Sequence, residues 1–142
     1  MKYHFKIYKE KRGCWAECVE LSGCITQAEN LEKLKKSMQE ALNLYLSEPK
    51  DSRVIFPKPQ KKLPSKKNIV AVPVDPRVAF AMTMRQLRIK KNQTQRQMMA
   101  FLGIKNLSTY QRFEDPKKAN PELITLTKIK ELLPEFSVEQ LF

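Results

Sequence analysis

The residues best suited to direct chemistry are three cysteines and the only histidine of the 142-residue sequence. Cys14, Cys18 and Cys24 follow His4 within a short span, and thiolates and imidazole nitrogens are the usual zinc ligands. However, Cys-x3-Cys with one remote cysteine and one remote histidine lacks the paired spacing of a structural zinc site. We therefore expect no metal, and we interpret the cysteines as buried, reduced thiols.

A cysteine nucleophile would need a basic partner, and His4 is the only histidine available. Residues 2–8 alternate apolar and polar side chains, which places His4 on the polar side of a predicted strand. Cys24 stands in the stretch LSGCITQ, residues 21–27, where Gly23 favours a backbone turn. Because no pairing of thiol and base is supported, we assign no catalytic residue and no cofactor, and we predict that the protein is not an enzyme.

Two more strands and one helix are predicted to follow that first strand. Residues 14–20 alternate after a turn that contains Gly13, and residues 25–26 suit a third short strand. An amphipathic helix is expected to begin after Asn30, a good N-cap residue, and to end by Pro49. Its apolar stripe comprises Leu31, Leu34, Met38, Ala41, Leu42 and Tyr45.

Residues 57–67, PKPQKKLPSKK, indicate an extended basic connector, because prolines exclude them from the interior of a helix or sheet. The apolar residues 69–74 predict one more strand, at a sheet edge or strand end because of Pro73. We assign this strand to the first domain, since the helix needs a larger sheet to bury its stripe. The first domain is therefore expected to span residues 1–74 as an α+β fold, a small antiparallel sheet with one packed helix.

Helix signals dominate residues 75–142, the expected second domain. The predicted helix starts, in chain order, are Asp75-Pro76, the capping box Thr94–Gln97, Ser108, Asn120-Pro121 and a second capping box, Ser137–Gln140. Gly103 is expected to form a tight turn between the second and third helices. Five short helices with such a turn predict an all-α helix-turn-helix domain.

The net charge of +12 is unevenly distributed, since residues 76–118 hold ten basic and two acidic residues while residues 119–142 are mildly acidic. Neutralisation of phosphates is the main source of sequence-independent affinity, so we expect a polyanionic partner for the second half. No apolar run is long enough to span a membrane, and an odd number of cysteines fits a reducing compartment. We therefore expect a cytoplasmic protein with no membrane partner.

The second half resembles the Cro/repressor-like helix-turn-helix family over about residues 76–134. The residues that carry the resemblance are Thr94-Gln95 at the second helix, Leu102-Gly103 at the turn, and Tyr110, Phe113 and Glu114 on the third helix. The resemblance implies that the protein binds operator double-stranded DNA, as a homodimer or a higher even oligomer on palindromic half-sites.

The candidate DNA-binding residues lie at the start of the second helix and around the third. Gln95 suits a phosphate contact, as do Lys105 and Asn106. Arg112 suits a bidentate contact to guanine, and Gln111 one to adenine. The full candidate set is Gln95, Lys105, Asn106, Leu107, Ser108, Thr109, Gln111 and Arg112.

The first half resembles the HicB antitoxin domain. The residues that carry this resemblance are Trp15, the turn Ser22-Gly23-Cys24-Ile25-Thr26-Gln27, and the helix from Leu31-Glu32 through Ala41-Leu42. The resemblance implies a partial RNase H-like fold that binds and neutralises a HicA-type, mRNA-cleaving toxin. It also implies that the helix-turn-helix domain represses the antitoxin's own operon.

HicA-type toxins are basic, according to the same resemblance, so acidic residues of the first domain are candidates for the contact. The candidate toxin-binding set is Glu10, Glu17 and Glu20, with Ser22 and Thr26 of the turn. Nuclease activity of the antitoxin itself is not expected, because clustered carboxylates would be required and residues 2–8 contain none. The alternative is a stand-alone helix-turn-helix transcriptional regulator whose N-terminal domain senses a ligand or another protein.

Apolar residues follow the fourth predicted helix and close the sequence. They are Phe136, Val138, Leu141 and Phe142. We expect them to form a dimerisation element, and the alternative is that they cover the core of their own protomer.

Overall fold

The structure is a computed structural model that describes residues 1–49, 51–63 and 66–142. It contains one four-stranded antiparallel sheet and five α-helices, which confirms the prediction of a mixed α+β protein. The chain divides into two compact units, residues 1–46 with 56–74 and residues 47–55 with 75–142. The segment 47–55 thus folds with the second unit, although the prediction counted it with the first domain. No helix in the described part of the chain is long and apolar enough to cross a membrane.

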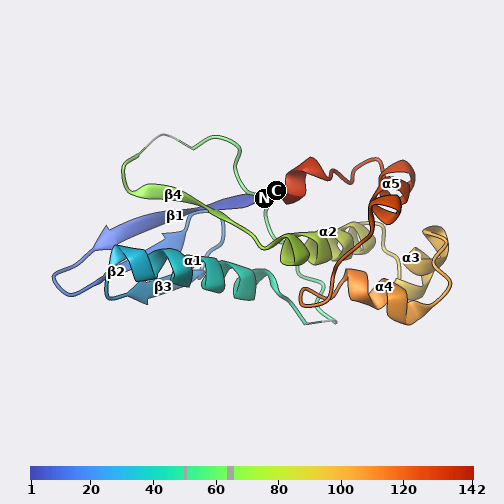
Figure 1. Cartoon of the computed structure of the whole chain (residues 1–142), viewed down its shortest axis with the longest axis horizontal. Coiled ribbons are helices and arrows are strands. Elements are labelled where there is room, and N and C mark those ends of the chain that lie inside the picture. The colour runs from blue at the N-terminus through green and yellow to red at the C-terminus, as the bar shows by residue number, and fades with distance from the viewer. Residues whose placement is uncertain (50, 64–65) are drawn as a thin grey trace. The chain divides into compact units, whose positions relative to one another are not determined.

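The first unit is built on the predicted strands. They are β1 (Lys2–Lys9), β2 (Cys14–Cys18), β3 (Ile25–Ala28) and β4 (Ile69–Pro73), in the spatial order β3-β2-β1-β4 (Figure 1). Phe5 of β1 stands opposite Cys18 of β2 and Val70 of β4, and all strand pairs are antiparallel. The hairpin turn between β1 and β2 contains Gly13 at φ 96°, a conformation that L side chains rarely adopt.

Helix α1 (Leu31–Leu46) packs across one face of this sheet (Figure 1). The Asn30 side chain caps the helix by accepting a hydrogen bond from the Lys33 backbone N–H at 2.9 Å, as predicted. Buried residues recur every second position along the strands and every three or four positions along the helix, as expected for one buried face of each. They are Tyr3, Phe5, Cys14, Ala16, Cys18, Leu34, Met38, Leu42, Leu46 and Val72. Leu31 lies outside this core, because it stands in the first turn and remains 42% exposed.

The second unit consists of short helices. They are α2 (Pro76–Lys90), α3 (Gln95–Phe101), α4 (Leu107–Phe113), α5 (Leu123–Leu132) and the 3-10 turn η1 (Glu139–Leu141). Asp75 caps α2 by accepting a hydrogen bond from the Arg77 backbone N–H at 2.8 Å, and Pro76 occupies the first turn, as predicted. Where five helices were predicted, the described residues of this unit form four α-helices and one 3-10 turn.

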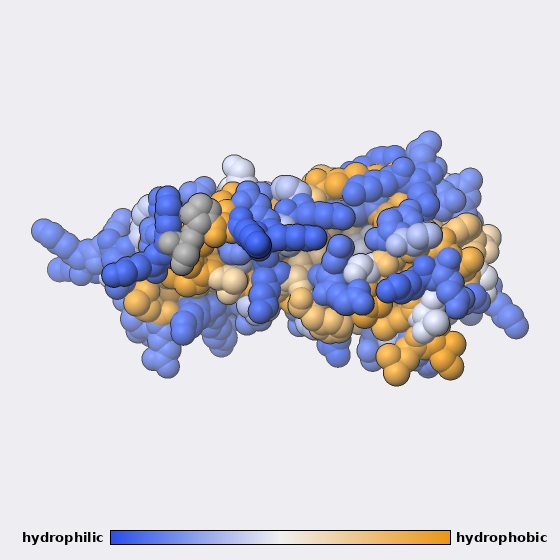
Figure 2. Space-filling model, turned by 90° about the horizontal axis from the view of Figure 1, so that it is seen from above, coloured by the Kyte–Doolittle hydropathy of each residue, from blue (hydrophilic) through white to orange (hydrophobic). Residues whose placement is uncertain are grey.

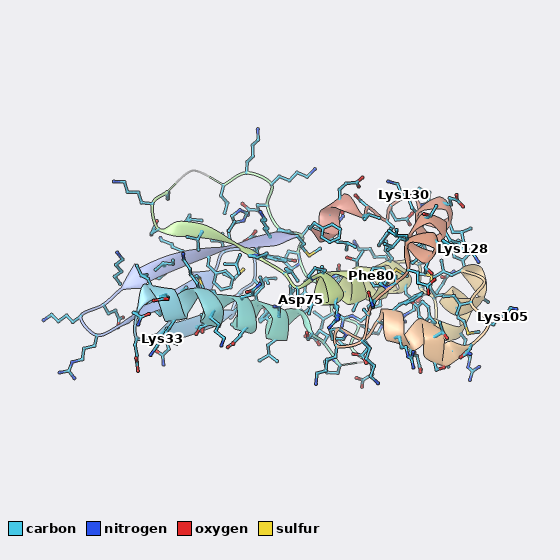
Figure 3. All side chains as sticks on the ribbon, viewed as in Figure 1. Lys33, Asp75, Phe80, Lys105, Lys128 and Lys130 are labelled. Atoms are coloured by element: carbon cyan, nitrogen blue, oxygen red, sulfur yellow. The ribbon has the colours of Figure 1, made fainter. Side chains whose placement is uncertain are left out.

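Aromatic side chains hold the core of the second unit together. Phe80 points from α2 into the interior (Figure 3), where its ring meets those of Phe113 and Phe136 edge to face, with centroids 5.7 and 6.0 Å apart. The other buried apolar residues of this unit include Met84, Leu87, Met98, Leu102, Tyr110, Ala119, Ile129, Leu133 and Leu141. Phe101 lies outside this core and is 43% exposed at the last turn of α3.

Two predicted starts of helices near the C-terminus are wrong. Helix α5 begins at Leu123 instead of directly after Asn120-Pro121, because Glu122 is still in an extended conformation, with φ −71° and ψ 157°, and occupies the N-cap position. At the C-terminus, the Ser137 hydroxyl donates to the Glu139 carboxylate at 2.7 Å, and the 3-10 turn η1 begins after Val138 without a side-chain cap, so the predicted capping box does not form.

Candidate nucleic-acid interface

Local sequence signals position α3 and the turn that follows it. The Thr94 hydroxyl accepts a hydrogen bond from the Gln97 backbone N–H at 3.1 Å, and the Gln97 side chain accepts one from the Thr94 N–H at 2.9 Å. This reciprocal pair is the predicted capping box. Leu102 is buried after the helix, and Gly103 turns the chain at φ 69°. The start and the end of α3 are therefore both fixed by residues next to them in the chain.

A buried ion pair fixes α4 against α2. The Arg88 guanidinium donates from Nε to Glu114 Oε2 at 2.7 Å and from Nη2 to Glu114 Oε1 at 2.9 Å. Its Nη1 donates to the Gln93 carbonyl at 3.2 Å, and the Tyr110 hydroxyl also donates to Glu114. The two charged side chains are only 11% and 4% exposed. This geometry is bidentate, which makes it directional as well as strong.

The surroundings of this pair raise the pKa values of Arg88 and of the neighbouring Tyr110. The hydrogen bond to the Glu114 carboxylate raises the pKa of Arg88 above its ordinary value. Burial, with the neighbouring Glu114 charge, raises the pKa of Tyr110 far above its ordinary value. Arg88 therefore stays cationic and Tyr110 stays a neutral hydrogen-bond donor at any pH near neutrality. Sequence reasoning missed Arg88, because nothing local links it to a residue 26 positions later.

The outward side of α4 is polar and accessible. Tyr110 and Phe113 face the core, so the residues between them face outward at the 3.6-residue period of the helix. Of the candidate DNA-binding residues, those that are exposed are Lys105, Asn106, Ser108, Thr109 and Arg112, and those that are half-buried are Gln95, Leu107 and Gln111. Figure 3 shows Lys105 pointing away from the turn between α3 and α4.

Two of the candidates contact each other across the turn. The Gln111 amide Nε2 donates to Gln95 Oε1 at 3.2 Å, which links the outer side of α4 to the first residue of α3. The Ser108 hydroxyl donates to Asn106 Oδ1 at 2.7 Å at the start of α4. These contacts hold four of the candidates in fixed positions. We call the set Gln95, Lys105, Asn106, Leu107, Ser108, Thr109, Gln111 and Arg112 the α3–α4 surface.

A cavity of about 540 Å³ adjoins this surface within the second unit. Gln95 and Leu107, both members of the α3–α4 surface, form part of its wall. The remaining lining residues are Asp51, Ser52, Arg53, Arg88, Ile89, Asn92, Gln93, Thr94 and Arg96. Sequence reasoning missed the contribution of residues 51–53, because it assigned them to the other domain.

The candidate toxin-binding carboxylates occupy different environments. Glu10 is exposed, and Glu17 is half-buried between Lys6 and Ile25 on the sheet face opposite α1. Glu20 is buried, with a side chain only 2% exposed, and it binds His4 Nδ1 at 2.8 Å. Its carboxylate also accepts hydrogen bonds from the His4 and Gln60 backbone N–H groups. Glu20 is therefore an internal anchor and not the surface charge that the prediction assumed.

The turn residues are also placed differently from one another. Ser22 is exposed, and its carbonyl accepts a hydrogen bond from the Tyr45 hydroxyl at 2.7 Å, which ties the turn to α1. Thr26 stands opposite Ala16 in the β2–β3 pairing and hence on the face that α1 covers, where it is half-buried. Gly23 turns the chain at φ 85°. Ser22 is thus accessible to a partner, whereas Thr26 is partly covered by the unit itself.

The three cysteines are buried and form no disulfide. Burial raises the pKa of Cys18 to about 11 and that of Cys24 to about 12, which disfavours the reactive thiolate. His4 Nδ1 lies 2.8 Å from Glu20 Oε2, and among the described residues no hydrogen bond joins His4 to a cysteine. In residues 1–49, 51–63 and 66–142, no three residues of the types His, Cys, Asp or Glu are grouped so that they could hold a metal ion.

The sheet face opposite α1 carries two stacked aromatic side chains, of which sequence reasoning singled out Trp15 but not Tyr8. Tyr8 and Trp15 stack across β1 and β2 with centroids 4.2 Å apart, and Lys6 Nζ lies 5.3 Å from the centre of the Tyr8 ring. Ile25 on β3 is 53% exposed on the same face. The alternation of β1 and β2 was the available signal, since it places Tyr8 and Trp15 opposite to the core residues.

The C-terminal apolar residues separate into two groups. Phe136 and Leu141 are buried in the core of their own unit, whereas Val138 is half-buried and Phe142 is 73% exposed. The predicted dimerisation element is thus in large part a cover of the protomer core. Leu123 and Ile124 at the start of α5 are each 82% exposed, and Figure 2 shows apolar side chains at the surface of the second unit among polar ones.

A comparison of the sequence with models of known protein families gave no match, and a comparison with curated proteins gave none either.

Proposed function

We propose that this protein is a DNA-binding antitoxin, in which the second unit binds operator DNA and the first unit binds a HicA-type toxin. The observation that carries the DNA-binding part is the α3–α4 surface. Most of its polar side chains point outward from the short helix α4. The Arg88–Glu114 ion pair holds this helix against α2, and the Gln95–Gln111 hydrogen bond links it to α3. A rigid polar helix of this kind is what reading of base edges in a major groove requires.

The charge of this region supports the same conclusion. Residues 76–118 hold ten basic and only two acidic residues. One of the two acidic side chains, Glu114, is buried against Arg88 and contributes no exposed negative charge. Around the α3–α4 surface, the accessible cations Lys105 and Arg112 are therefore free to meet phosphates or bases.

The toxin-binding part rests on the resemblance to HicB antitoxins and on the accessible residues of the first unit. Glu10 and Ser22 are exposed, and Glu17 is half-buried on the sheet face that also carries Tyr8 and Trp15. Aromatic side chains are enriched in protein interfaces, and acidic groups beside them would complement a basic partner. Glu20 is left out of this set because its carboxylate is already occupied.

Two experiments test the two parts separately. For DNA, the full chain is mixed with a duplex from the region upstream of its gene and with an unrelated duplex, and tighter binding of the first is expected. For the toxin, the chain is co-expressed with a neighbouring gene for a small protein, and rescue of growth together with co-purification is expected. A Glu17→Lys variant that rescues as well as the wild type would remove Glu17 from the contact.

The alternative function is a stand-alone transcriptional regulator with a sensing N-terminal unit. It shares the DNA-binding part and differs only in the partner of the first unit. Failure of every neighbouring small protein to co-purify, with operator binding retained, would favour this alternative.

A further inference from the structure

We propose that the cavity beside the α3–α4 surface binds a phosphate of the DNA backbone, and that Arg53 and Arg96 are the residues that contact it. This inference rests on the proposed DNA-binding function. It extends the interface to Arg53, which belongs to neither the helix-turn-helix nor its sequence pattern.

The position of the cavity decides which partner would reach it. Gln95 and Leu107 form part of its wall and also belong to the α3–α4 surface. A duplex whose major groove receives α4 must run its backbone past the residues that border that helix. Phosphates of the same duplex are therefore the groups that come closest to this cavity.

The charged side chains that line the cavity are suited to binding an anion. Of its three arginines, Arg88 is fully engaged with Glu114 and with the Gln93 carbonyl. Arg53 and Arg96 are exposed, and neither makes an ion pair with any residue that the structure describes. Asp51 is the only acidic residue of the wall, so the two accessible guanidinium groups outnumber it. A guanidinium matches the geometry of a phosphate better than any other side chain does.

The proposed phosphate contact also assigns a function to the segment 47–55, which contributes Arg53 to the cavity wall. This segment follows α1 in the chain but folds with the second unit. Ser52 and Arg53 stand in the cavity wall beside Thr94 and Gln95, which open α3. The segment thus adds a cation to the DNA-binding unit that the helix-turn-helix sequence alone does not provide.

The test measures the salt dependence of binding to the upstream duplex and to an unrelated duplex of equal length, with the full chain. Arg53→Ala and Arg96→Ala are each expected to reduce the slope of log K against log salt by about one. Each should weaken both duplexes by the same factor, roughly fivefold near physiological salt. Arg53→Lys should retain the slope, and Arg12→Ala, an exposed arginine of the first unit, should change nothing.

The outcomes separate this inference from the function on which it rests. If the wild type binds neither duplex, the proposed function and this inference both fail. If the wild type binds the upstream duplex while Arg53→Ala leaves slope and affinity unchanged, the inference about the cavity is overturned and the function stands. A change in preference for the upstream duplex, instead of an equal loss on both, would also overturn it, because a backbone contact carries no sequence information. Unchanged thermal unfolding of each variant shows that the loss arises from the contact.

Discussion

Gln95 and Gln111 are joined by a hydrogen bond from the Gln111 amide to Gln95 Oε1 at 3.2 Å. The first residue of α3 is thereby coupled to the outer side of α4, although 16 positions separate the two residues in the chain. Such a contact restricts the rotamers of both side chains in the protein alone. If the α3–α4 surface binds DNA as proposed, the position of Gln111 relative to a base edge is partly set in advance, which lowers the cost of ordering it on binding.

This coupling predicts non-additive effects on DNA binding. Gln95→Ala should weaken binding both through its own lost contact and by releasing Gln111. A double-mutant cycle with Gln111→Ala, measured as affinity for the upstream duplex, should give an interaction energy of at least about 0.5 kcal/mol. Strictly additive losses would show that the two side chains act independently on DNA.

The buried Arg88–Glu114 pair predicts a large loss of stability when it is broken. Glu114→Gln leaves the Arg88 cation at 11% exposure without its counterion, which should cost about 3–5 kcal/mol of unfolding free energy. Urea unfolding followed by the helical circular dichroism signal measures this loss. The control is Glu135→Gln, which breaks the exposed Lys91–Glu135 pair and should cost less than about 1 kcal/mol. Equal losses for the two variants would refute the assignment of Glu114 as the anchor of α4.

Replacing either of the two turn glycines of the first unit with alanine is expected to destabilise the protein, and one replacement should cost more than the other. Gly13 and Gly23 both have positive φ, so alanine at either position should cost about 1–2 kcal/mol in backbone strain. At Gly13 the added Cβ would also lie 2.7 Å from the Ala28 carbonyl oxygen, whereas at Gly23 it would meet nothing. Gly13→Ala should therefore be the more destabilised variant. Trp15 is the only tryptophan, so its fluorescence during urea unfolding reports on this unit. The opposite order would contradict the geometry of the β1–β2 turn.

The buried thiols predict a pH dependence. Because burial raises the pKa values of Cys18 and Cys24 above those of the unfolded chain, the folded state holds its thiol protons at a pH where the unfolded state loses them. Their contribution to stability is therefore complete below about pH 9 and decreases as the pH rises through about 11 and 12. Iodoacetamide at pH 8 should modify these two cysteines slowly in the native protein and rapidly in urea. Equal rates in both states would mean that the thiols are accessible.

Most signals between neighbours in the chain were read correctly from the sequence, apart from the Asn120-Pro121 helix start and the Ser137–Gln140 capping box, whereas several contacts between distant residues were missed. The Thr94–Gln97 capping box and the Asn30 cap are hydrogen bonds within one helical turn, so their residue types and spacing suffice to predict them. The Glu20 carboxylate was read as a surface charge, because no sequence pattern shows that the chain past β2 folds it against His4 and Gln60. The candidate DNA-binding residues could be named from the pattern of α4, but Arg53 could not, since the segment 47–55 joins the second unit only through tertiary packing.

Under the proposed function, Arg112 on the outer side of α4 reads a base of operator DNA. The most direct test of this role is the affinity of the wild type and of Arg112→Ala for the upstream duplex and for an unrelated duplex at one salt concentration. The loss on the upstream duplex should be about 1–3 kcal/mol, and the preference over the unrelated duplex should fall with it. If Arg112→Ala retains both the affinity and the preference of the wild type, the assignment of α4 as the base-reading helix is contradicted.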